Sequence, residues 1–300
     1  MFTGTGTALV TPFRRDGSLD EPTLRALIKR QIEAGIDFLV PCGTTGESPT
    51  LTHEEHLRVV EITVEEAKDR VPVLAGAGGY NTAEVITLAR ELAARGANGI
   101  LSVTPYYNKP TQEGLFQHFR AIAEAVSLPI ILYSVQGRTG VNIEPATVKR
   151  LATIENILGI KEASGNIGQM AAILNAVPEE FMVLSGDDAI TLPLLALGGR
   201  GVISVVSNEV PAQMAQLTRL ALAGGFAAAR QLHRRLHALM EINFVESNPI
   251  PVKAAMAQMG LLEPVWRLPL VAPSAANETR IRGVLESLGL VEKAHAIAAA

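Results

Sequence analysis

The stretch Ile157-Leu158-Gly159-Ile160-Lys161-Glu162-Ala163-Ser164-Gly165 joins a short apolar run to a polar turn that ends in glycine. Seven further apolar runs along the 300 residues end in a similar polar or glycine-rich cluster, and a helical pattern follows each ending. This alternation of buried strands and amphipathic helices is what a closed parallel barrel requires. The sequence therefore predicts an α/β fold, a (β/α)8 TIM barrel, with all eight strand endings on one face.

The expected strands are short and rich in Val, Ile and Leu without strict alternation, as strands buried on both faces should be. Helical periodicity is clearest at 23–33, 53–68, 83–94, 112–126 and 167–176, and Thr52 with Glu55 forms a capping-box pattern before the second of these. The predicted strands are 6–10, 38–41, 71–75, 99–103, 129–132, 157–160, 181–184 and 201–205.

About 90 residues remain after the eighth strand, and they show helical patterns at 212–223, 226–240, 251–259 and 275–288. A barrel of ordinary size needs roughly 250 residues. We therefore expect a barrel over 1–210 and a C-terminal helical extension over 211–300 that packs on it.

The composition argues against several classes of partner. The net charge is −4 without a cluster of Lys and Arg, so nucleic acid is not expected. No apolar run approaches the ~18 residues of a membrane span, and the first six residues lack the features of an export signal. Cys42 is the only cysteine, which fits a reducing compartment. A cytoplasmic protein is expected.

Lys161 is the candidate for covalent chemistry, because its side chain should emerge at the catalytic end of the sixth strand. An amine attacks a carbonyl only in its neutral form, which an apolar environment favours. Tyr133 ends the neighbouring strand and can give and take a proton there. The alternatives are a lysine paired with Glu162 and a tyrosine that only packs.

Other strand endings carry groups that could hold a carboxylate. Thr44 and Thr45 lie in a glycine-flanked turn with hydroxyls and converging backbone N–H groups. Arg138 follows the fifth strand and could bind a carboxylate in a bidentate manner, or could be a surface arginine. Tyr106 and Tyr107 follow the fourth strand, so three of the four tyrosines lie at predicted strand ends.

Several weaker signals are given their simpler interpretation. The Gly76–Gly79 cluster lacks the third glycine and the acidic residue of a dinucleotide site. Asp187-Asp188 has no further ligand at metal spacing and is expected to cap a helix. His53 and His56 lack a third ligand for zinc, and Cys42 is expected to pack as a small buried residue. No metal or organic cofactor is predicted.

Together these motifs resemble the dihydrodipicolinate synthase family of pyruvate-dependent class I aldolases, to which N-acetylneuraminate lyase is related. The resemblance runs from Phe2 to about Leu290. It rests on the segments 43–47, 105–108, 133–140, 159–165 and 185–188.

The resemblance implies a reaction and a role for each site residue. Lys161 would form a Schiff base with pyruvate, and Tyr133, Thr44 and Tyr107 would relay protons. Thr45 would hold the pyruvate carboxylate, with Gly186 and the backbone near Ile203 also contacting substrate. Arg138 would hold the carboxylate of aspartate 4-semialdehyde. Tyr107 would act in the site of the other chain of a tight dimer, within a homotetramer.

Two departures from the family pattern lie next to Arg138. Ser134 and Gln136 replace an asparagine and a proline, and loss of the proline removes a backbone restraint. Arg138 itself is kept, which favours the synthase over the sugar-acid lyases, whose equivalent segment lacks it. Another pyruvate aldolase, acting on a 2-keto-3-deoxy sugar acid or N-acetylneuraminate, is the alternative, followed by a barrel that binds a small acid without turnover.

The resemblance also implies a hypothesis of feedback inhibition by L-lysine. In sensitive members the inhibitor site uses residues that match Ser48, His53, His56, Glu84 and Tyr106. Tyr80 replaces a usual asparagine, and Pro49 a common alanine.

Overall fold

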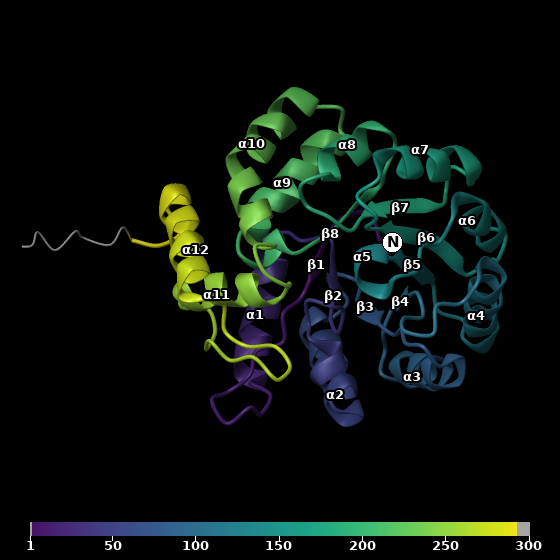
Figure 1. The fold of residues 1–300 in the computed structure, drawn as a ribbon, viewed down its shortest axis with the longest axis horizontal. Coiled ribbons are helices and arrows are strands. Elements are labelled where there is room, and N and C mark those ends of the chain that lie inside the picture. The colour runs from purple at the N-terminus through teal and green to yellow at the C-terminus, as the bar shows by residue number, and fades with distance from the viewer. Residues whose placement is uncertain (1, 293–300) are drawn as a thin grey trace, which may run out of the picture.

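The computed structural model describes residues 2–292, and its eight parallel strands form a barrel surrounded by helices (Figure 1). Neighbouring strands follow the order β2-β1-β8-β7-β6-β5-β4-β3, and a parallel bridge between Leu39 and Val73 joins the two ends. The predicted (β/α)8 barrel is confirmed. The strands are β1 (Gly4–Ala8), β2 (Phe38–Val40), β3 (Leu74–Gly76), β4 (Gly99–Val103), β5 (Ile130–Ser134), β6 (Ile157–Glu162), β7 (Met182–Ser185) and β8 (Gly201–Ser204).

The helices follow the strands in the expected alternation, and several begin with a polar capping residue. Thr52 and Glu55 form the predicted capping box at the start of α2. The α-helices are α1 (Glu21–Glu33), α2 (His53–Ala67), α3 (Thr82–Ala94), α4 (Gln112–Ala125), α5 (Gln136–Thr139), α6 (Pro145–Leu151), α7 (Ile167–Ala176), α8 (Thr191–Ala196), α9 (Pro211–Leu222), α10 (Phe226–Ile242), α11 (Ile250–Gln258) and α12 (Ala275–Leu288). Short 3₁₀ helices span Ser48–Thr50 and Val206–Asn208.

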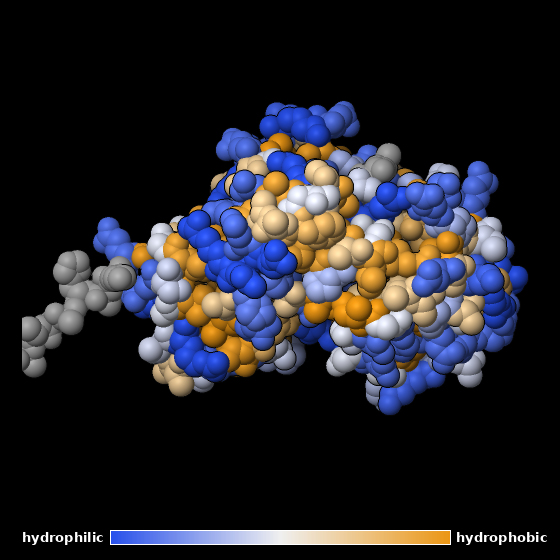
Figure 2. Space-filling view, turned by 90° about the horizontal axis from the view of Figure 1, so that it is seen from above, coloured by the Kyte–Doolittle hydropathy of each residue, from blue (hydrophilic) through white to orange (hydrophobic). Residues whose placement is uncertain are grey.

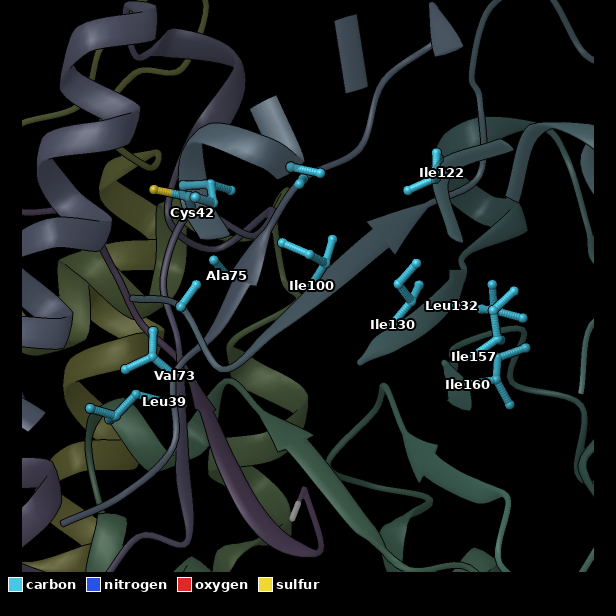
Figure 3. Close-up of a cluster of buried hydrophobic side chains, with 14 of the residues drawn as sticks. Leu39, Cys42, Val73, Ala75, Ile100, Ile122, Ile130, Leu132, Ile157 and Ile160 are labelled. Atoms are coloured by element: carbon cyan, nitrogen blue, oxygen red, sulfur yellow. The ribbon is translucent and has the colours of Figure 1, made fainter. Parts of the chain in front are cut away.

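Side chains of each strand alternate between the barrel interior and the surrounding helices. On β5, Ile131 and Tyr133 belong to the interior cluster, whereas Ile130 and Leu132 pack outward. Figure 3 shows Ile130, Leu132, Ile157 and Ile160 in the outer cluster. This alternation decides which polar side chains at the ends of β5 and β6 can reach the site and which face the helices.

Aromatic rings fill the interior near the start of the strands. Phe2 and Phe38 lie edge to face with their ring centres 5.6 Å apart. Gly6 and Gly99 leave room for them, since a Cβ added to either would lie 2.7 Å or less from a ring atom. The interior is therefore packed at this end, and a cavity can open only at the opposite end of the strands.

The C-terminal extension forms a layer along one side of the barrel, next to α1 and α8 (Figure 1). Its four helices lie within two residues of the predicted ranges and share an apolar core that includes Met214, Leu236, Leu239 and Ile281. Positions 293–300 of the predicted extension lie outside the described residues. Apolar and polar side chains alternate over the face seen in Figure 2. None of the helices within residues 2–292 is long and apolar enough to cross a membrane.

Three strands, β1, β5 and β6, have boundaries that differ from the predictions near the candidate site. The first strand was expected at 6–10 but lies at Gly4–Ala8. Val10 is buried not in the sheet but in a cluster with Val252 and Met256 of α11. Strands β5 and β6 also extend further than expected, so that Tyr133 and Lys161 lie inside regular, hydrogen-bonded strands.

Candidate active site

Lys161 and Tyr133 face each other across adjacent strands, as predicted. The two residues are paired in the register of β5 and β6, and both are buried. The amine Nζ of Lys161 lies 4.1 Å from the centre of the Tyr133 ring. Among the residues that the structure describes, no carboxylate forms an ion pair with this amine. The alternative in which Glu162 neutralises Lys161 is wrong, because Glu162 points to the outer side of the barrel.

Gly186, at the end of β7, leaves space for the lysine. A Cβ added at this position would lie 3.1 Å from Lys161 Cε and 2.5 Å from the Cβ of Ala163. A side chain here would therefore displace Lys161 from its place beside Tyr133.

A cavity of about 110 Å³ lies over Lys161 at the carboxyl ends of the strands. It brings together six of the predicted site residues: Lys161, Tyr133, Thr44, Thr45, Arg138 and Gly186. Ile203 is fully buried in the barrel interior and does not line it; Val205, two residues further on, does. The volume is sufficient for a small acid such as a keto acid next to Lys161.

The turn that carries Thr44 and Thr45 is tied to the C-terminal extension. Thr45 is buried, and its hydroxyl accepts a hydrogen bond of 2.9 Å from the Asn248 side chain. Glu47, at the end of the turn, adopts a left-handed backbone with φ of 54° and forms a fully buried ion pair with Lys253 of α11. Burial lowers the pKa of Lys253, and the carboxylate of Glu47 opposes this shift.

Arg138 lies in α5, a single helical turn that begins at Gln136, the position of the missing proline. Gly140 ends the turn with φ of 69° and donates its N–H to the carbonyl of Gln136 at 2.9 Å. The Arg138 guanidinium donates to the Asn248 carbonyl at 3.1 Å. The turn therefore forms without the proline, and Arg138 lines both the small cavity and an outer one of about 520 Å³.

Asn248 and Lys253 support the candidate site and were not expected from the sequence. Asn248 lines the cavity and contacts both Thr45 and Arg138, and its Oδ1 atom is buried without a partner among the described residues. Lys253 had one visible signal, since it is a single charge within the apolar run Ile250-Pro251-Val252-Lys253-Ala254-Ala255-Met256. Neither lies at a strand end, where barrel sites are sought.

Tyr107 lies apart from its own Lys161. It is 91% exposed, has a left-handed backbone with φ of 68°, and lines a larger cavity of about 840 Å³ rather than the small one. Tyr133, Thr44 and Arg138 line both cavities, so the two spaces meet at the barrel mouth.

The larger cavity also contains three of the six residues expected at a lysine site: Ser48, His56 and Tyr106. Tyr80 contacts Tyr106 edge to face, with ring centres 5.3 Å apart, but is not among the lining residues.

Three residues of the predicted lysine site form contacts within the chain. His53 pairs with Glu91 at 2.8 Å, and Glu84 accepts a hydrogen bond of 2.8 Å from Asn81. His56 Nε2 donates to the Gly76 carbonyl at 2.8 Å, and burial lowers its pKa. The neutral ring of His56 then has Nδ1 as an acceptor.

Three remaining predictions concern Cys42, the aspartate pair and metals. Cys42 is buried as expected, and burial raises the pKa of its thiol, which opposes a nucleophilic role. The prediction that Asp187-Asp188 caps a helix is wrong: Asp188 Oδ2 accepts from the N–H groups of Val205 and Val206 after β8. Within residues 2–292, no three His, Cys, Asp or Glu side chains gather as metal ligands.

Comparison with known proteins identifies the family. The model of the dihydrodipicolinate synthetase family matches residues 1–288. The 4-hydroxy-tetrahydrodipicolinate synthase of Koribacter versatilis is 53% identical over 97% of each chain. The chloride-inhibited dihydrodipicolinate synthase of Acinetobacter baumannii in complex with pyruvate superposes with a TM-score of 0.96, at 43% identity over 97% of this chain and 100% of that one. The lysine-bound enzyme of Cyanidioschyzon merolae gives a TM-score of 0.93, at 41% identity over 97% and 99% of the two chains.

These matches span nearly the whole chain, so the chain belongs to the dihydrodipicolinate synthetase family.

Proposed function

We propose that this protein condenses pyruvate with L-aspartate 4-semialdehyde through a Schiff base on Lys161, which gives 4-hydroxy-tetrahydrodipicolinate for diaminopimelate and lysine biosynthesis. The observation that carries the proposal is the buried amine of Lys161 against the Tyr133 ring, without an ion-pair partner among the described residues, in a cavity of about 110 Å³. The name of the Koribacter versatilis relative supports this substrate pair.

The first half of the reaction loads pyruvate onto the enzyme. The neutral Lys161 amine adds to the ketone carbon of pyruvate, and the carbinolamine loses water to form an imine. Tyr133 gives a proton to the departing hydroxyl and regains one when the methyl carbon is deprotonated. Thr45 binds the pyruvate carboxylate, and Thr44 links Tyr133 to the larger cavity. The imine itself takes up the electron pair, so this step needs no metal or organic cofactor.

The second half forms the carbon–carbon bond and frees the enzyme. The enamine carbon adds to the aldehyde of aspartate semialdehyde, whose carboxylate Arg138 binds in a bidentate manner. The amino group of this adduct then adds to the imine carbon, and the ring closes as Lys161 leaves as a free amine. Gly186 and the backbone near Ile203 line the path of the substrate.

Two chains are proposed to form each pair of sites. Tyr107 is almost fully exposed in a single chain although it lies at the rim of the larger cavity, an arrangement that fits a residue covered by a second copy. Tyr107 of the partner subunit would complete the proton relay of Tyr133 and Thr44. The proposed assembly is a homotetramer of two tight dimers, which sedimentation would report as four times 31.9 kDa. A cytoplasmic location fits the single buried cysteine.

L-lysine is proposed to inhibit the enzyme by binding in the larger cavity. The cavity offers the Ser48 hydroxyl, the neutral His56 ring and the Tyr106 phenol, and the lysine-bound relative from Cyanidioschyzon merolae supports this assignment. Glu84 would approach the ligand ammonium, with Tyr80 behind Tyr106. His53, bound to Glu91, would act at the rim. A titration that leaves turnover unchanged at millimolar L-lysine would remove this part of the proposal.

The substrate test compares aldehydes at fixed pyruvate. We expect turnover with aspartate 4-semialdehyde and little cleavage of N-acetylneuraminate or of a 2-keto-3-deoxy sugar acid. Arg138→Lys keeps the charge but loses the bidentate geometry, so its KM for aspartate semialdehyde should rise more than its KM for pyruvate. Faster cleavage of a sugar acid would identify a different aldolase, and failure to bind pyruvate covalently would identify a non-catalytic barrel.

A further inference from the structure

The residues that follow Tyr133 and Lys161 form a pair of their own on the outer side of the barrel. Ser134 follows Tyr133 on β5, Glu162 follows Lys161 on β6, and the two are paired in the strand register. Both are fully buried. Because neighbouring residues of a strand point to opposite faces, these side chains lie directly behind the site.

Glu162 is a buried carboxylate with two defined donors. Its Oε1 accepts 2.7 Å from the Gln169 side chain of α7, and its Oε2 accepts 3.2 Å from the Ser164 N–H. Burial raises the pKa of Glu162, and these hydrogen bonds oppose the shift. Burying a carboxylate without a cation beside it is costly, and its hydrogen bonds offset part of that cost.

The Gln169 side chain also binds Asn142, which lies in the loop that follows Arg138. Its amide donates 3.0 Å to Asn142 Oδ1, and its oxygen accepts 2.7 Å from Asn142 Nδ2. Asn142 Oδ1 also accepts 3.3 Å from the Ser134 hydroxyl, and Ser134 Oγ accepts 3.1 Å from the Ile143 N–H. The chain Glu162–Gln169–Asn142–Ser134, called here the outer hydrogen-bond chain, therefore connects β6 to β5.

The direction of every donor in this chain follows from the carboxylate. Glu162 Oε1 only accepts, so the Gln169 amide must turn its nitrogen toward it. The orientation of the Gln169 amide fixes that of the Asn142 amide. Asn142 Oδ1 is then placed to accept a hydrogen bond from the Ser134 hydroxyl. If position 162 offered a donor to Gln169, both amides would turn over and the Ser134 hydroxyl would lose its acceptor.

We propose that the outer hydrogen-bond chain positions Tyr133 and Lys161 for proton transfer and holds the end of the Arg138 loop against them. The inference rests on the proposed Schiff-base chemistry. Ser134 takes part through its hydroxyl, which binds both Asn142 and the Ile143 backbone. Glu162 and Ser134 are thus positioning residues that act through the backbone of β6 and β5 and do not touch the substrate.

The test replaces one carboxylate oxygen of Glu162, within the outer hydrogen-bond chain, by an amide nitrogen. Glu162→Gln keeps the shape of the side chain but introduces a donor opposite either Gln169 or Ser164. A small displacement of reacting groups is enough to lower kcat by roughly 10- to 100-fold, with little change in the KM for pyruvate. The rate is measured per active site, counted by borohydride trapping of pyruvate, so that loss of folded protein does not contribute.

A further variant provides the control. Glu113→Gln changes a similar pair, since Gln117 donates 2.6 Å to Glu113 on the exposed face of α4, and should leave kcat unchanged.

The possible outcomes separate this inference from the proposed function. If the wild-type protein does not trap pyruvate, the proposed function fails. If it traps pyruvate and turns over while Glu162→Gln keeps kcat per trapped site within about twofold, the positioning role fails. Should Glu162→Gln not fold, Ser134→Ala decides: a lower kcat per site supports the role, and an unchanged one overturns it.

Discussion

Two lysines are buried in the described part of this chain, and their surroundings differ in one respect. Lys253 forms an ion pair with Glu47, whereas Lys161 lies on the ring of Tyr133 with no carboxylate beside it. Lys161 also lines the small cavity, where a keto acid could reach its amine, whereas Lys253 is not among the residues that line it. Lys161 is therefore the lysine suited to nucleophilic attack. Its place at a strand end was predictable, but the partner of Lys253 was not, because they are 206 residues apart.

Removing only the phenol hydroxyl separates proton transfer from packing. Tyr133→Phe keeps the ring beside Lys161, so the amine should still form an imine, but kcat should fall by about 10²–10⁴-fold, the usual contribution of a positioned acid–base group. Steady-state kinetics with both substrates measure this directly. A rate close to wild type would show that another group transfers the proton.

At the scale of secondary structure, periodicity located the strands and most of the longer helices. It could not distinguish a residue buried within the sheet from one buried under a helix beyond the end of a strand. The apolar run through Val10 continues beyond β1, because α11 rather than the sheet covers its end. Asp188 precedes α8 in sequence but binds the backbone after β8, which lies beside β7 in the barrel. Contacts of this kind depend on strand order and not on local sequence.

The helical turn that carries Arg138 should accept a proline at its first residue. Gln136 is the first residue of α5, a position where proline is well accepted because its N–H is not needed. Gln136→Pro should therefore raise the free energy of unfolding by about 0.4–1 kcal/mol, through reduced freedom of the unfolded chain. Chemical denaturation checks this value. Destabilisation would mean that the N–H of Gln136 has a partner.

For the whole molecule, the C-terminal extension takes part in the site. Asn248 binds Thr45 and Arg138, and Lys253 binds Glu47, so the turns that carry Thr45 and Arg138 are held from a segment far along the chain. The division into 1–210 and 211–300 stays a prediction, and these bonds cross it. They could not be found from sequence alone, because no periodicity relates the two segments.

A buried carboxylate between the barrel and the C-terminal extension, that of Glu209, should make the free energy of unfolding depend on pH. Burial raises the pKa of Glu209 well above its ordinary value, and among the described residues one of its oxygens has no hydrogen-bond partner while the other binds Asn243. The folded state therefore holds a proton that the unfolded state releases, and its stability falls as pH rises from about 4.5 toward the raised pKa.

Glu209→Gln mimics the protonated side chain at every pH. The variant should unfold at a higher temperature than wild type at pH 8, and the difference should shrink as pH falls toward 4.5. Thermal unfolding across this range provides the measurement. An equal gain at all pH values would mean that Glu209 does not change its protonation on unfolding.

Covalent capture of the keto acid by one amine, that of Lys161, underlies every later step of the proposed reaction. Intact-protein and peptide mass spectrometry after borohydride reduction with pyruvate measures this capture. We expect a single reduced adduct per chain, located on Lys161 and absent from Lys161→Ala, while Lys253 stays unmodified. An adduct that persists in Lys161→Ala, or that maps to another lysine, would contradict it.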